Sequence, residues 1–527
     1  MKNVLKLEEL SVEQKLGLAT ISFNWKASIK PENMEYLAEL VKNRMLGGVW
    51  MTPLHGENAP YIKRLKELAD YPLLVFTDAE RGLGEYSIGG HNTIGVTDNE
   101  ELAYTFGKIT AARAAAMEYN VVCNPILDMS NENCIAGGTM RGYGADKDRV
   151  TALAAAEAQG MHDGGCLTIG KHYPGRSQGS NISRIDSHMG GITSSATKED
   201  LLDYALYPYM ELDKKGLLDG VMLGHTTFVN IDPDYPVSLS KHGIQILRDQ
   251  GFEGLAITDS LTMMAVVAKY GHKNSVGYCV GNANAMALPW QEDHSKVIQW
   301  MRECYDEGII TDEALDETVK RVIAMQEKVL SLPTGVKPTE EEFNKFHRLN
   351  TDSVCALVDD GLTTTLDKNG KYYFAILTEA GKHENVSVVT FKDQWYNPVA
   401  IQERLEKEFP NAKAGLLSEF PSSGEIQAFL EDSLDRETVF VTFCMTQAYV
   451  GVEKFTPRIT SLIDAMQTSN RVSTVVHFGN PFLLEDLPHI PRILVGTIST
   501  KGVDATLDVL TGKYPAKGVM TYDVNLK

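Results

Sequence analysis

The chain has 527 residues, of which 70 are acidic and 50 are basic, so its formal net charge at pH 7 is −20. No basic stripe stands out against this acidic balance, which argues against a nucleic-acid partner and against a polybasic membrane anchor. Hydrophobic residues make up 43% of the chain and charged residues 23%, proportions that are ordinary for a globular protein and exclude intrinsic disorder or a fibrous structure.

The N-terminal part of the chain repeats one pattern, in which a short apolar run ends in a polar or glycine-rich cluster and a helical stretch often follows. Such runs are typical of strands buried on both faces. Helical character lies between them, for example in Glu101–Tyr119 and Glu199–Lys215. The runs predicted as strands are Ala19–Phe23, Gly47–Met51, Leu73–Asp78, Val121–Asp128, Cys166–His172, Gly220–His225, Leu255–Asp259 and Ala285–Trp290.

Strands that alternate with helices predict right-handed crossovers and a parallel sheet. Eight such units fit a (β/α)8 TIM-like barrel, which we assign to residues 1–335. Its last helix is predicted at Asp312–Leu330, where the apolar side chains form one stripe. The predicted fold class is therefore α/β, with this barrel followed by a smaller domain.

The smaller domain is predicted to follow a linker and helix at residues 336–350. Thr339 and Glu342 form a capping-box pattern at the start of this helix. New apolar runs then alternate with helical segments such as Ala400–Phe409 and Arg458–Thr468, and we assign residues 351–527 to an α/β sandwich domain. These runs are Tyr372–Leu377, Val386–Thr390, Thr438–Phe443, Thr474–His477 and Ile493–Val495.

The seven cysteines are scattered and show no Cys-x-x-Cys spacing, a pattern typical of reduced core thiols. The N-terminal segment MKNVLKLEELSVEQK has no apolar signal region, and no run of about 18 apolar residues occurs in the chain. We therefore expect a cytoplasmic protein that has no membrane partner.

Ionisable side chains stand at the carboxyl ends of consecutive predicted strands. In a parallel barrel these ends share one face, where catalytic side chains gather. A single residue of this kind is commonly a helix cap or part of a buried ion pair, but the whole series favours an active site. The strand-end residues are Asp78, Asp128, Lys171, His172, His225 and Asp259.

Two elements carry the expected chemistry. Asp259 ends a hydrophobic strand and can serve as a nucleophile, a general base or a metal ligand, or as the N-cap of a helix predicted at Ser260–Lys269. In the polar loop Gly175–His188, Asp186 and His188 are two residues apart, so on an extended segment they point the same way. A carboxylate bonded to one imidazole nitrogen fixes the tautomer and leaves the other nitrogen to move a proton.

These residues stand in segments that resemble glycoside hydrolase family 3, and within it the β-N-acetylglucosaminidase branch. The resemblance follows the chain in order and covers nearly all of it. Its most specific part is KHYPG, followed by an Asp-x-His pair and a Thr-Asp strand end. The matching segments are LSVEQKLG, TDAERGLG, NPILDM, MRGYGAD, KHYPG, DSH, VMLGH, DPDYPVSLS, ITDSLTMM and the tail ILVGTISTKGVDATLDVLTGKYPAKG.

The resemblance implies a role for each matching residue. Asp259 corresponds to a catalytic nucleophile that forms a covalent glycosyl–enzyme intermediate, with retention of the anomeric configuration. His188 corresponds to the general acid/base, and Asp186 to its partner in a dyad. The residues that correspond to those binding the sugar hydroxyls are Asp78, Arg141, Lys171 and His172, and His225 is assigned to the same substrate-binding group.

The predicted function is thus an exo-glycosidase that removes terminal β-N-acetylglucosamine from small carbohydrates without a metal or other cofactor. Two segments depart from the family pattern: Arg176–Gln178 replaces a usual His-Gly-Asp, and Asp78–Gly82 replaces a usual Asp-x-Glu-Gly-Gly. A β-glucosidase, a β-xylosidase or a phosphorylase of the same family therefore stays open. A metal-dependent barrel hydrolase with His172, His225 and Asp259 as ligands, and a catalytically silent sugar-binding protein, are the alternatives from other classes.

Overall fold

The computed structural model describes residues 2–24, 31–51, 56–130, 141–175, 187–290, 293–378, 396–444, 455–521 and 524. The chain forms two compact units. The first consists of Met1–Ser87 and Asn99–Phe346, and the second consists of Ile88–Asp98 and His347–Lys527. Each unit has its own main sheet, so each is described by itself.

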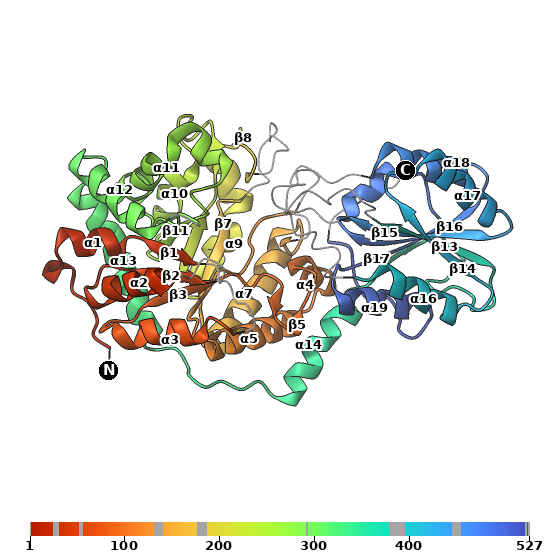
Figure 1. The fold of residues 1–527 in the computed structure, drawn as a ribbon, viewed down its shortest axis with the longest axis horizontal. Helices are drawn as coiled ribbons and strands as arrows, with labels where there is room; N and C mark the ends of the chain where they lie inside the picture. Colours follow the sequence, from red (N-terminus) through yellow and green to blue (C-terminus); the bar gives the residue numbers. More distant parts are fainter. Residues whose placement is uncertain are drawn as a thin grey trace. The chain divides into compact units, whose positions relative to one another are not determined.

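The main sheet of the first unit is curled and has seven strands, all parallel to their neighbours (Figure 1). Its strands are short and almost entirely buried, as expected where helices cover a parallel sheet. Seven of the eight predicted runs overlap these strands, although β1 and β7 each extend one residue beyond the predicted end. Along the sheet they are β1 (Ile21–Asn24), β2 (Gly48–Met51), β3 (Leu74–Thr77), β6 (Val121–Val122), β7 (Leu167–Tyr173), β9 (Gly220–Leu223) and β11 (Leu255–Thr258).

The eighth predicted run, Ala285–Trp290, does not form a regular strand. It makes one parallel bridge to each edge of the sheet, Thr20 to Ala287 and Ile257 to Met286. The ladder stops because the Leu288 N–H donates to the Thr258 hydroxyl (3.2 Å) and Pro289 has no N–H to donate. Both edges of the curled sheet therefore contact this one irregular segment.

One apolar cluster contains residues from all seven strands and from the irregular segment. Where a strand contributes two members, they are two residues apart, because side chains of a strand alternate between its faces. A single cluster drawn from every strand lies on the inner side of the curled sheet. Its main members are Ile21, Phe23, Trp50, Leu74, Phe76, Val121, Cys123, Leu167, Ile169, Met222, Leu255, Ile257, Met286 and Leu288.

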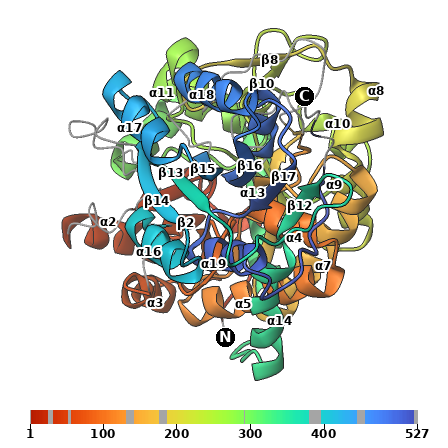
Figure 2. The same ribbon diagram turned by 90° about the vertical axis from the view of Figure 1, so that its right-hand side faces the viewer.

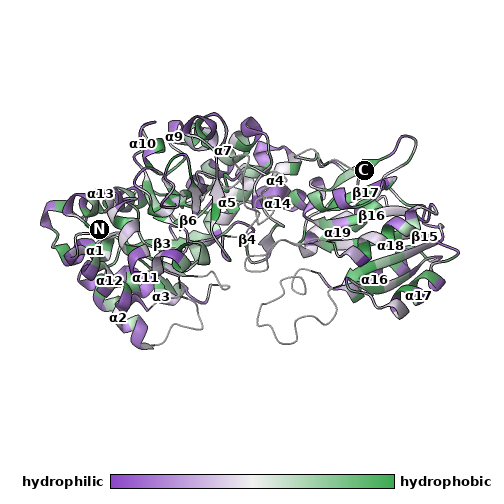
Figure 3. Cartoon of the chain, turned by 90° about the horizontal axis from the view of Figure 1, so that it is seen from above, coloured by the Kyte–Doolittle hydropathy of each residue, from purple (hydrophilic) through white to green (hydrophobic). Residues whose placement is uncertain are grey.

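Most helices of the first unit follow strands, and several of them are amphipathic. On α12, the buried residues His294, Val297, Met301 and Cys304 recur at helical spacing, while the other face is hydrophilic (purple in Figure 3). The helices are α1 (Val12–Leu18), α2 (Pro31–Lys42), α3 (Ala59–Leu68), α5 (Glu100–Ala116), α7 (Lys147–Gly164), α8 (Lys198–Asp200), α9 (Tyr207–Lys214), α10 (Gln245–Arg248), α11 (Met264–Gly281), α12 (His294–Asp306) and α13 (Asp312–Val329), and α14 (Glu340–Asp352) runs on into the second unit.

Glycines allow α5 and α7 to approach closely. A Cβ at Gly107 on α5 would lie 2.1 Å from the Glu157 carbonyl oxygen, and one at Gly160 on α7 would lie 2.1 Å from the Tyr104 carbonyl oxygen. Any larger residue would therefore push the two helices apart. The single helix predicted at Glu199–Lys215 is instead divided into α8, the π-helical turn η3 (Leu201–Ala205) and α9.

The second unit has a six-stranded sheet with helices on both faces. Figures 1 and 2 show α17 (Ser423–Asp432) and α18 (Pro457–Gln467) on one face, and α16 (Pro398–Glu408) and α19 (Thr500–Leu510) on the other. Only β12 runs antiparallel to its neighbour. Along the sheet the strands are β12 (Cys355–Val358), β17 (Arg492–Gly496), β16 (Val472–Gly479), β15 (Glu437–Cys444), β13 (Tyr372–Thr378) and β14 (Lys413–Ser418).

These strands contain four of the five runs predicted for this region, and Val386–Thr390 lies outside the described residues. The predicted capping box of α14 is confirmed: the Thr339 N–H donates to Glu342 Oε2 (2.7 Å), and the Glu342 N–H donates to Thr339 Oγ1 (3.2 Å). The short helix α4 (His91–Thr97) packs in the second unit, where the Val519 N–H donates to the Val96 carbonyl oxygen (2.8 Å). Among the helices of the described ranges, none combines the length and the apolar character that crossing a bilayer requires.

Asp219, at the start of β9, joins two helices to the sheet of the first unit. Its carboxylate accepts hydrogen bonds from Lys328 Nζ on α13 (2.9 Å) and from the Thr168 N–H on β7 (3.0 Å), and it lies 2.7 Å from His162 Nε2 on α7. Burial opposes ionisation of this carboxyl group, but His162 and Lys328 hold its pKa at about 2.

We predict that Asp219→Asn lowers the free energy of unfolding by about 3 kcal/mol at pH 7, because it leaves buried donors without a charged acceptor. The folded-state pKa is depressed from 3.8 to about 2, so this stabilisation is complete above pH 3.8 and is lost as the pH falls towards 2. Urea unfolding of the unsubstituted protein and of Asp219→Asn between pH 7 and pH 3 measures this stabilisation. The exposed control Asp203→Asn should change the free energy by less than about 0.5 kcal/mol, and an equal loss in both variants would contradict the assignment.

Candidate active site

The alternation of side chains along three strands continues past the apolar core and ends in polar residues. Two residues beyond the core members Phe76, Ile169 and Ile257 stand Asp78, Lys171 and Asp259. Side chains two apart share a face, so these three belong to the inner row at the carboxyl edge of the sheet. Three predicted site residues are thus brought to one edge by the regular geometry of the strands.

Lys171 is the most deeply buried charge of this group, with its side chain 1% exposed. Its ammonium forms ion pairs with Asp78 and with Glu80 Oε1, the latter at 2.6 Å. Burial disfavours the charged form, but these two carboxylates outweigh it and raise the pKa of Lys171. The lysine is therefore a fixed positive charge.

Glu80 also binds Arg141, through two parallel hydrogen bonds. Arg141 Nε donates to Glu80 Oε2 (2.8 Å) and Arg141 Nη2 donates to Glu80 Oε1 (2.6 Å). Burial opposes ionisation of Glu80, but Arg141 and Lys171 hold its pKa well below the usual range. The sequence-based assignment missed Glu80, although its place two residues after Asp78 is the signal that could have identified it.

His172 is held between two charged groups. Its Nδ1 lies 2.6 Å from Asp128 Oδ2, and its Nε2 lies 3.1 Å from Arg141 Nη2. The Asp128 carboxylate and the Arg141 guanidinium therefore hold the imidazole in one orientation. Its Nε2 is also 3.9 Å from Asp259 Oδ2.

Asp259 follows β11, and its side chain is 15% exposed. Its Oδ1 accepts a hydrogen bond from the Ser260 N–H (2.8 Å), which orients the carboxylate. The helix expected to start at Ser260 begins only at Met264, so Asp259 is not its N-cap. The alternative interpretation of Asp259 as a helix N-cap is therefore wrong. The Asp259 carboxylate lies at the carboxyl edge of the sheet and caps no helix.

His188 is anchored to the start of α11, the helix that follows Asp259. The N–H of Met264 donates to the His188 carbonyl oxygen, and the N–H of Ala265 donates to the Ser187 carbonyl oxygen, both at 3.3 Å. The helix has no side-chain cap at Met263, so these carbonyls take up N–H groups that its first turn leaves unsatisfied. Asp186, its predicted partner, lies outside the described residues.

His225 uses both ring nitrogens within the protein. Its Nδ1 lies 2.7 Å from Ser238 Oγ, and its Nε2 lies 2.9 Å from the carbonyl oxygen of Ser260, the residue after Asp259. It is 3% exposed. These contacts assign it to supporting the Asp259 turn, and they leave neither nitrogen for the metal site considered from the sequence. In the part of the chain that the structure describes, no group of three or more His, Cys, Asp or Glu residues could hold a metal ion.

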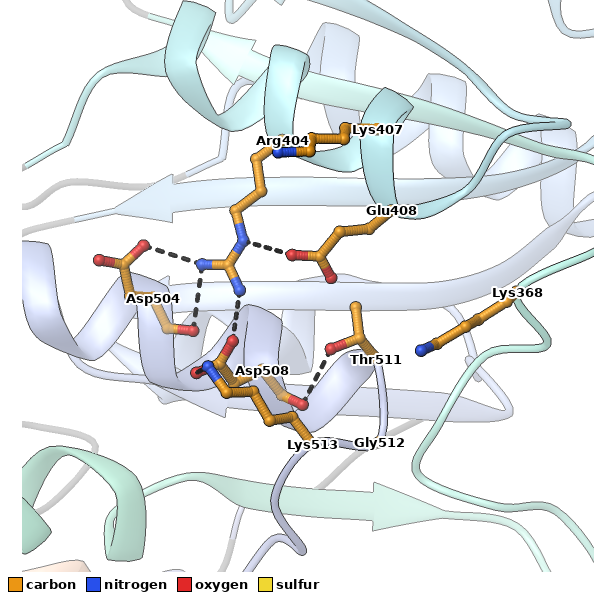
Figure 4. Close-up of a pocket in the computed structure, with 9 residues that line it drawn as sticks. All are labelled: Lys368, Arg404, Lys407, Glu408, Asp504, Asp508, Thr511, Gly512 and Lys513. Carbon is orange, nitrogen blue, oxygen red and sulfur yellow. Dashed lines mark hydrogen bonds and ion pairs between the residues drawn. The ribbon is translucent and has the colours of Figure 1, made fainter.

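A pocket of about 860 Å³ lies in the second unit, and none of the residues that line it is a predicted site residue (Figure 4). Arg404 of α16 reaches across it to α19, where it pairs with Asp504 (2.8 Å) and Asp508, and it also binds Glu408 (2.9 Å). Three carboxylates satisfy this guanidinium. The pocket is therefore lined by a structural ion-pair network that joins two helices.

Comparison with known proteins supports one family. Residues 6–325 match the model of the glycosyl hydrolase family 3 N-terminal domain. A beta-hexosaminidase of Tolumonas auensis is 29% identical over 251 residues, which cover 44% of this chain and 72% of that protein. A solved glycoside hydrolase family 3 beta-N-acetylglucosaminidase of Paenibacillus sp. str. FPU-7 has a TM-score of 0.79 at 21% identity, covering 98% of this chain and all of that one. The solved beta-glucoside phosphorylase BglX has a TM-score of 0.78 at 21% identity, covering 98% of this chain and 94% of that one.

We predict that Glu80→Gln lowers the free energy of unfolding by about 3 kcal/mol, because it removes the countercharge shared by Arg141 and buried Lys171. The matched control is Glu85→Gln, whose side chain is 70% exposed and 3.6 Å from Arg113, and which should lose less than about 0.5 kcal/mol. Denaturant unfolding measures both. In a double-mutant cycle with Arg141→Gln the losses should be less than additive, and strictly additive losses would rule out the coupling.

Proposed function

The chain belongs to glycosyl hydrolase family 3 and is a glycoside hydrolase, and from this premise we propose that it is a retaining exo-glycosidase acting on terminal β-N-acetylglucosaminides. The observation that carries the proposal is the carboxylate of Asp259, which stands in the same inner row as Lys171 and Asp78 and has Oδ2 3.9 Å from His172 Nε2. A half-buried, oriented carboxylate beside fixed cations is suited to attack an anomeric carbon.

In the proposed first step, Asp259 Oδ2 forms a bond to the anomeric carbon while the bond to the leaving oxygen breaks. His188 donates a proton to that oxygen, and a glycosyl ester of Asp259 results. In the second step, water attacks the same carbon, its proton passes to His188, and the ester bond breaks to release the Asp259 carboxylate. Two inversions give net retention. Asp186 is the proposed dyad partner, whose carboxylate orients the His188 imidazole for proton transfer.

The polar network around Lys171 is proposed to bind the sugar. The carboxylate of Asp78, half exposed beside Lys171, accepts hydrogen bonds from hydroxyls, and the cations of Arg141 and Lys171 donate to them. The orientation of the His172 ring is fixed by Asp128 and Arg141. Glu80 binds Arg141 and Lys171 and holds them in place. His225 contacts the Ser260 carbonyl oxygen and so supports the turn at Asp259. Such contacts accelerate the reaction if they strengthen as the ring flattens towards an oxocarbenium ion.

The choice of N-acetylglucosamine is supported by the name of the Tolumonas relative, a beta-hexosaminidase. The proposal also includes the domain assignment, with a catalytic (β/α)8 TIM-like barrel at residues 1–335, in which segment 285–288 serves as the eighth strand. A linker and helix at 336–350 and an α/β sandwich domain at 351–527 complete it. A cytoplasmic location and a small carbohydrate substrate, with neither a nucleic acid nor a membrane as partner, belong to the same proposal. Five buried free cysteines among the described residues are consistent with a reducing compartment.

We predict that a 5-fluoro N-acetylglucosaminyl fluoride labels the enzyme at Asp259, because the ring fluorine slows both formation and hydrolysis of the glycosyl ester, while the good leaving group keeps formation fast enough for the ester to accumulate. Mass spectrometry of proteolytic peptides identifies the labelled carboxylate. Asp259→Asn should lose label and lower kcat/KM by at least about 10³-fold. The exposed control Asp249→Asn should label normally. A label on any other carboxylate would refute the nucleophile assignment.

A panel of aryl β-glycosides of N-acetylglucosamine, glucose and xylose tests the sugar and the acceptor. We expect the highest kcat/KM for the N-acetylglucosaminide, and free sugar of retained configuration as the first product seen by NMR. Adding inorganic phosphate should change neither product nor rate. Preference for the glucoside or xyloside would reject the proposed sugar, and formation of a sugar 1-phosphate would replace hydrolysis with phosphorolysis.

A further inference from the structure

The edge of the curled sheet that carries the polar network has an aromatic counterpart. Phe23, Trp50 and Phe76 stand opposite one another in the registers of β1, β2 and β3. Their rings form a continuous row, with centroids 6.4 Å apart for Phe23 and Trp50 and 6.3 Å apart for Trp50 and Phe76. These three strands and the irregular segment 285–288 are neighbours, so the aromatic residues occupy one side of the inner row.

Trp290 extends this aromatic row towards Asp259. The bridge between Thr20 and Ala287 puts Trp290 level with Phe23, and the two rings stack with centroids 4.7 Å apart and planes 29° apart. Phe76, Trp50 and Phe23 are 0%, 5% and 7% exposed, whereas Trp290 is only half-buried. Trp290 is thus the most accessible ring of the row, and stacking on Phe23 fixes its orientation.

The chain around Trp290 is fixed beside the proposed nucleophile. The Leu288 N–H donates to Thr258 Oγ1 (3.2 Å), and the Leu261 N–H donates to the Leu288 carbonyl oxygen (2.9 Å). The backbone of Leu288 is therefore hydrogen-bonded to Thr258 and to Leu261, which lie on either side of Asp259 in the sequence. Met286, Leu288 and Trp290 are two residues apart, so Trp290 continues the inward-facing set of its segment just as Asp259 continues that of β11.

From this arrangement, and resting on the proposed function, we infer that Trp290 is a binding residue that takes the apolar C–H face of a pyranose ring at the active site. A pyranose has hydroxyls around its edge and C–H groups on its faces, so a site with polar groups on one side and an aromatic ring on the other matches both. The ring it holds is either the sugar attacked by Asp259 or the sugar of the leaving group, and the two sources are separable by experiment.

The first test uses binding, which does not depend on turnover. In an Asp259→Asn chain, titration with N-acetylglucosamine and with its β-linked disaccharide should change the tryptophan fluorescence. Trp290→Phe should remove most of this change and weaken binding by less than about threefold, whereas Trp290→Ala should weaken it at least about tenfold, as loss of an aromatic anchor does. The matched control is Trp300→Phe on α12, where Trp300 stacks on His272 at 6.0 Å, and it should keep both the affinity and the signal.

The second test separates the two rings. In chains that retain Asp259, kcat/KM is measured for a glycosyl fluoride, whose leaving group has no ring, and for the disaccharide. An equal loss in Trp290→Ala on both substrates assigns the attacked sugar, and a loss confined to the disaccharide assigns the leaving group.

Normal binding, fluorescence and turnover by Trp290→Ala would overturn the inference and leave the proposed function standing. A parent chain that turns over a glucoside but no N-acetylglucosaminide would overturn the proposed sugar, while the same Trp290 comparison on glucose still tests the inference. A parent chain that binds neither sugar would overturn both.

Discussion

The ammonium of Lys171 imposes the constraint on which the rest of the candidate site depends. It is 1% exposed and lies at the end of a buried strand, where an uncompensated charge would cost several kcal/mol. Asp78 and Glu80 supply the compensation from the segment after β3. Glu80 in turn binds Arg141, Arg141 contacts one ring nitrogen of His172, and Asp128 contacts the other. The segments that follow β3 and β6 are thereby joined by charge to the end of β7.

This network divides the inner row of the curled sheet into two chemically different sides. The ends of β3, β7 and β11 carry the charged residues Asp78, Lys171 and Asp259. The side formed by β1, β2 and segment 285–290 carries stacked aromatic rings that end at Trp290. The hydroxyl groups at the edge of a sugar bind to polar side chains, and its C–H faces bind to aromatic rings. Side chains two residues apart along the strands and along segment 285–290 form both surfaces.

The proposed catalytic groups differ in how they are held. Asp259 stands directly after a strand, with one oxygen bound to the next backbone N–H and with His225 supporting the turn. Ser187 and His188 cap the start of α11 through their backbone carbonyls. The proposed nucleophile is thus placed precisely by the strand that it follows. The proposed acid/base residue is held to the start of a helix by backbone atoms alone, so its anchoring does not depend on side-chain identity.

The sequence by itself determined the α/β class, the places of the seven strands in the main sheet of the first unit, the capping box of α14 and the residues at the strand ends, because apolar periodicity and local capping act over a few neighbouring positions. It did not determine that Ala285–Trp290 forms single bridges instead of a ladder, since this depends on the Thr258 hydroxyl of another strand. Nor did it identify Glu80 as the shared countercharge or Phe23 as the ring behind Trp290. Only the tertiary structure decided these, because Glu80 and Arg141 are 61 residues apart and meet only when the sheet curls and brings distant strand ends to one edge.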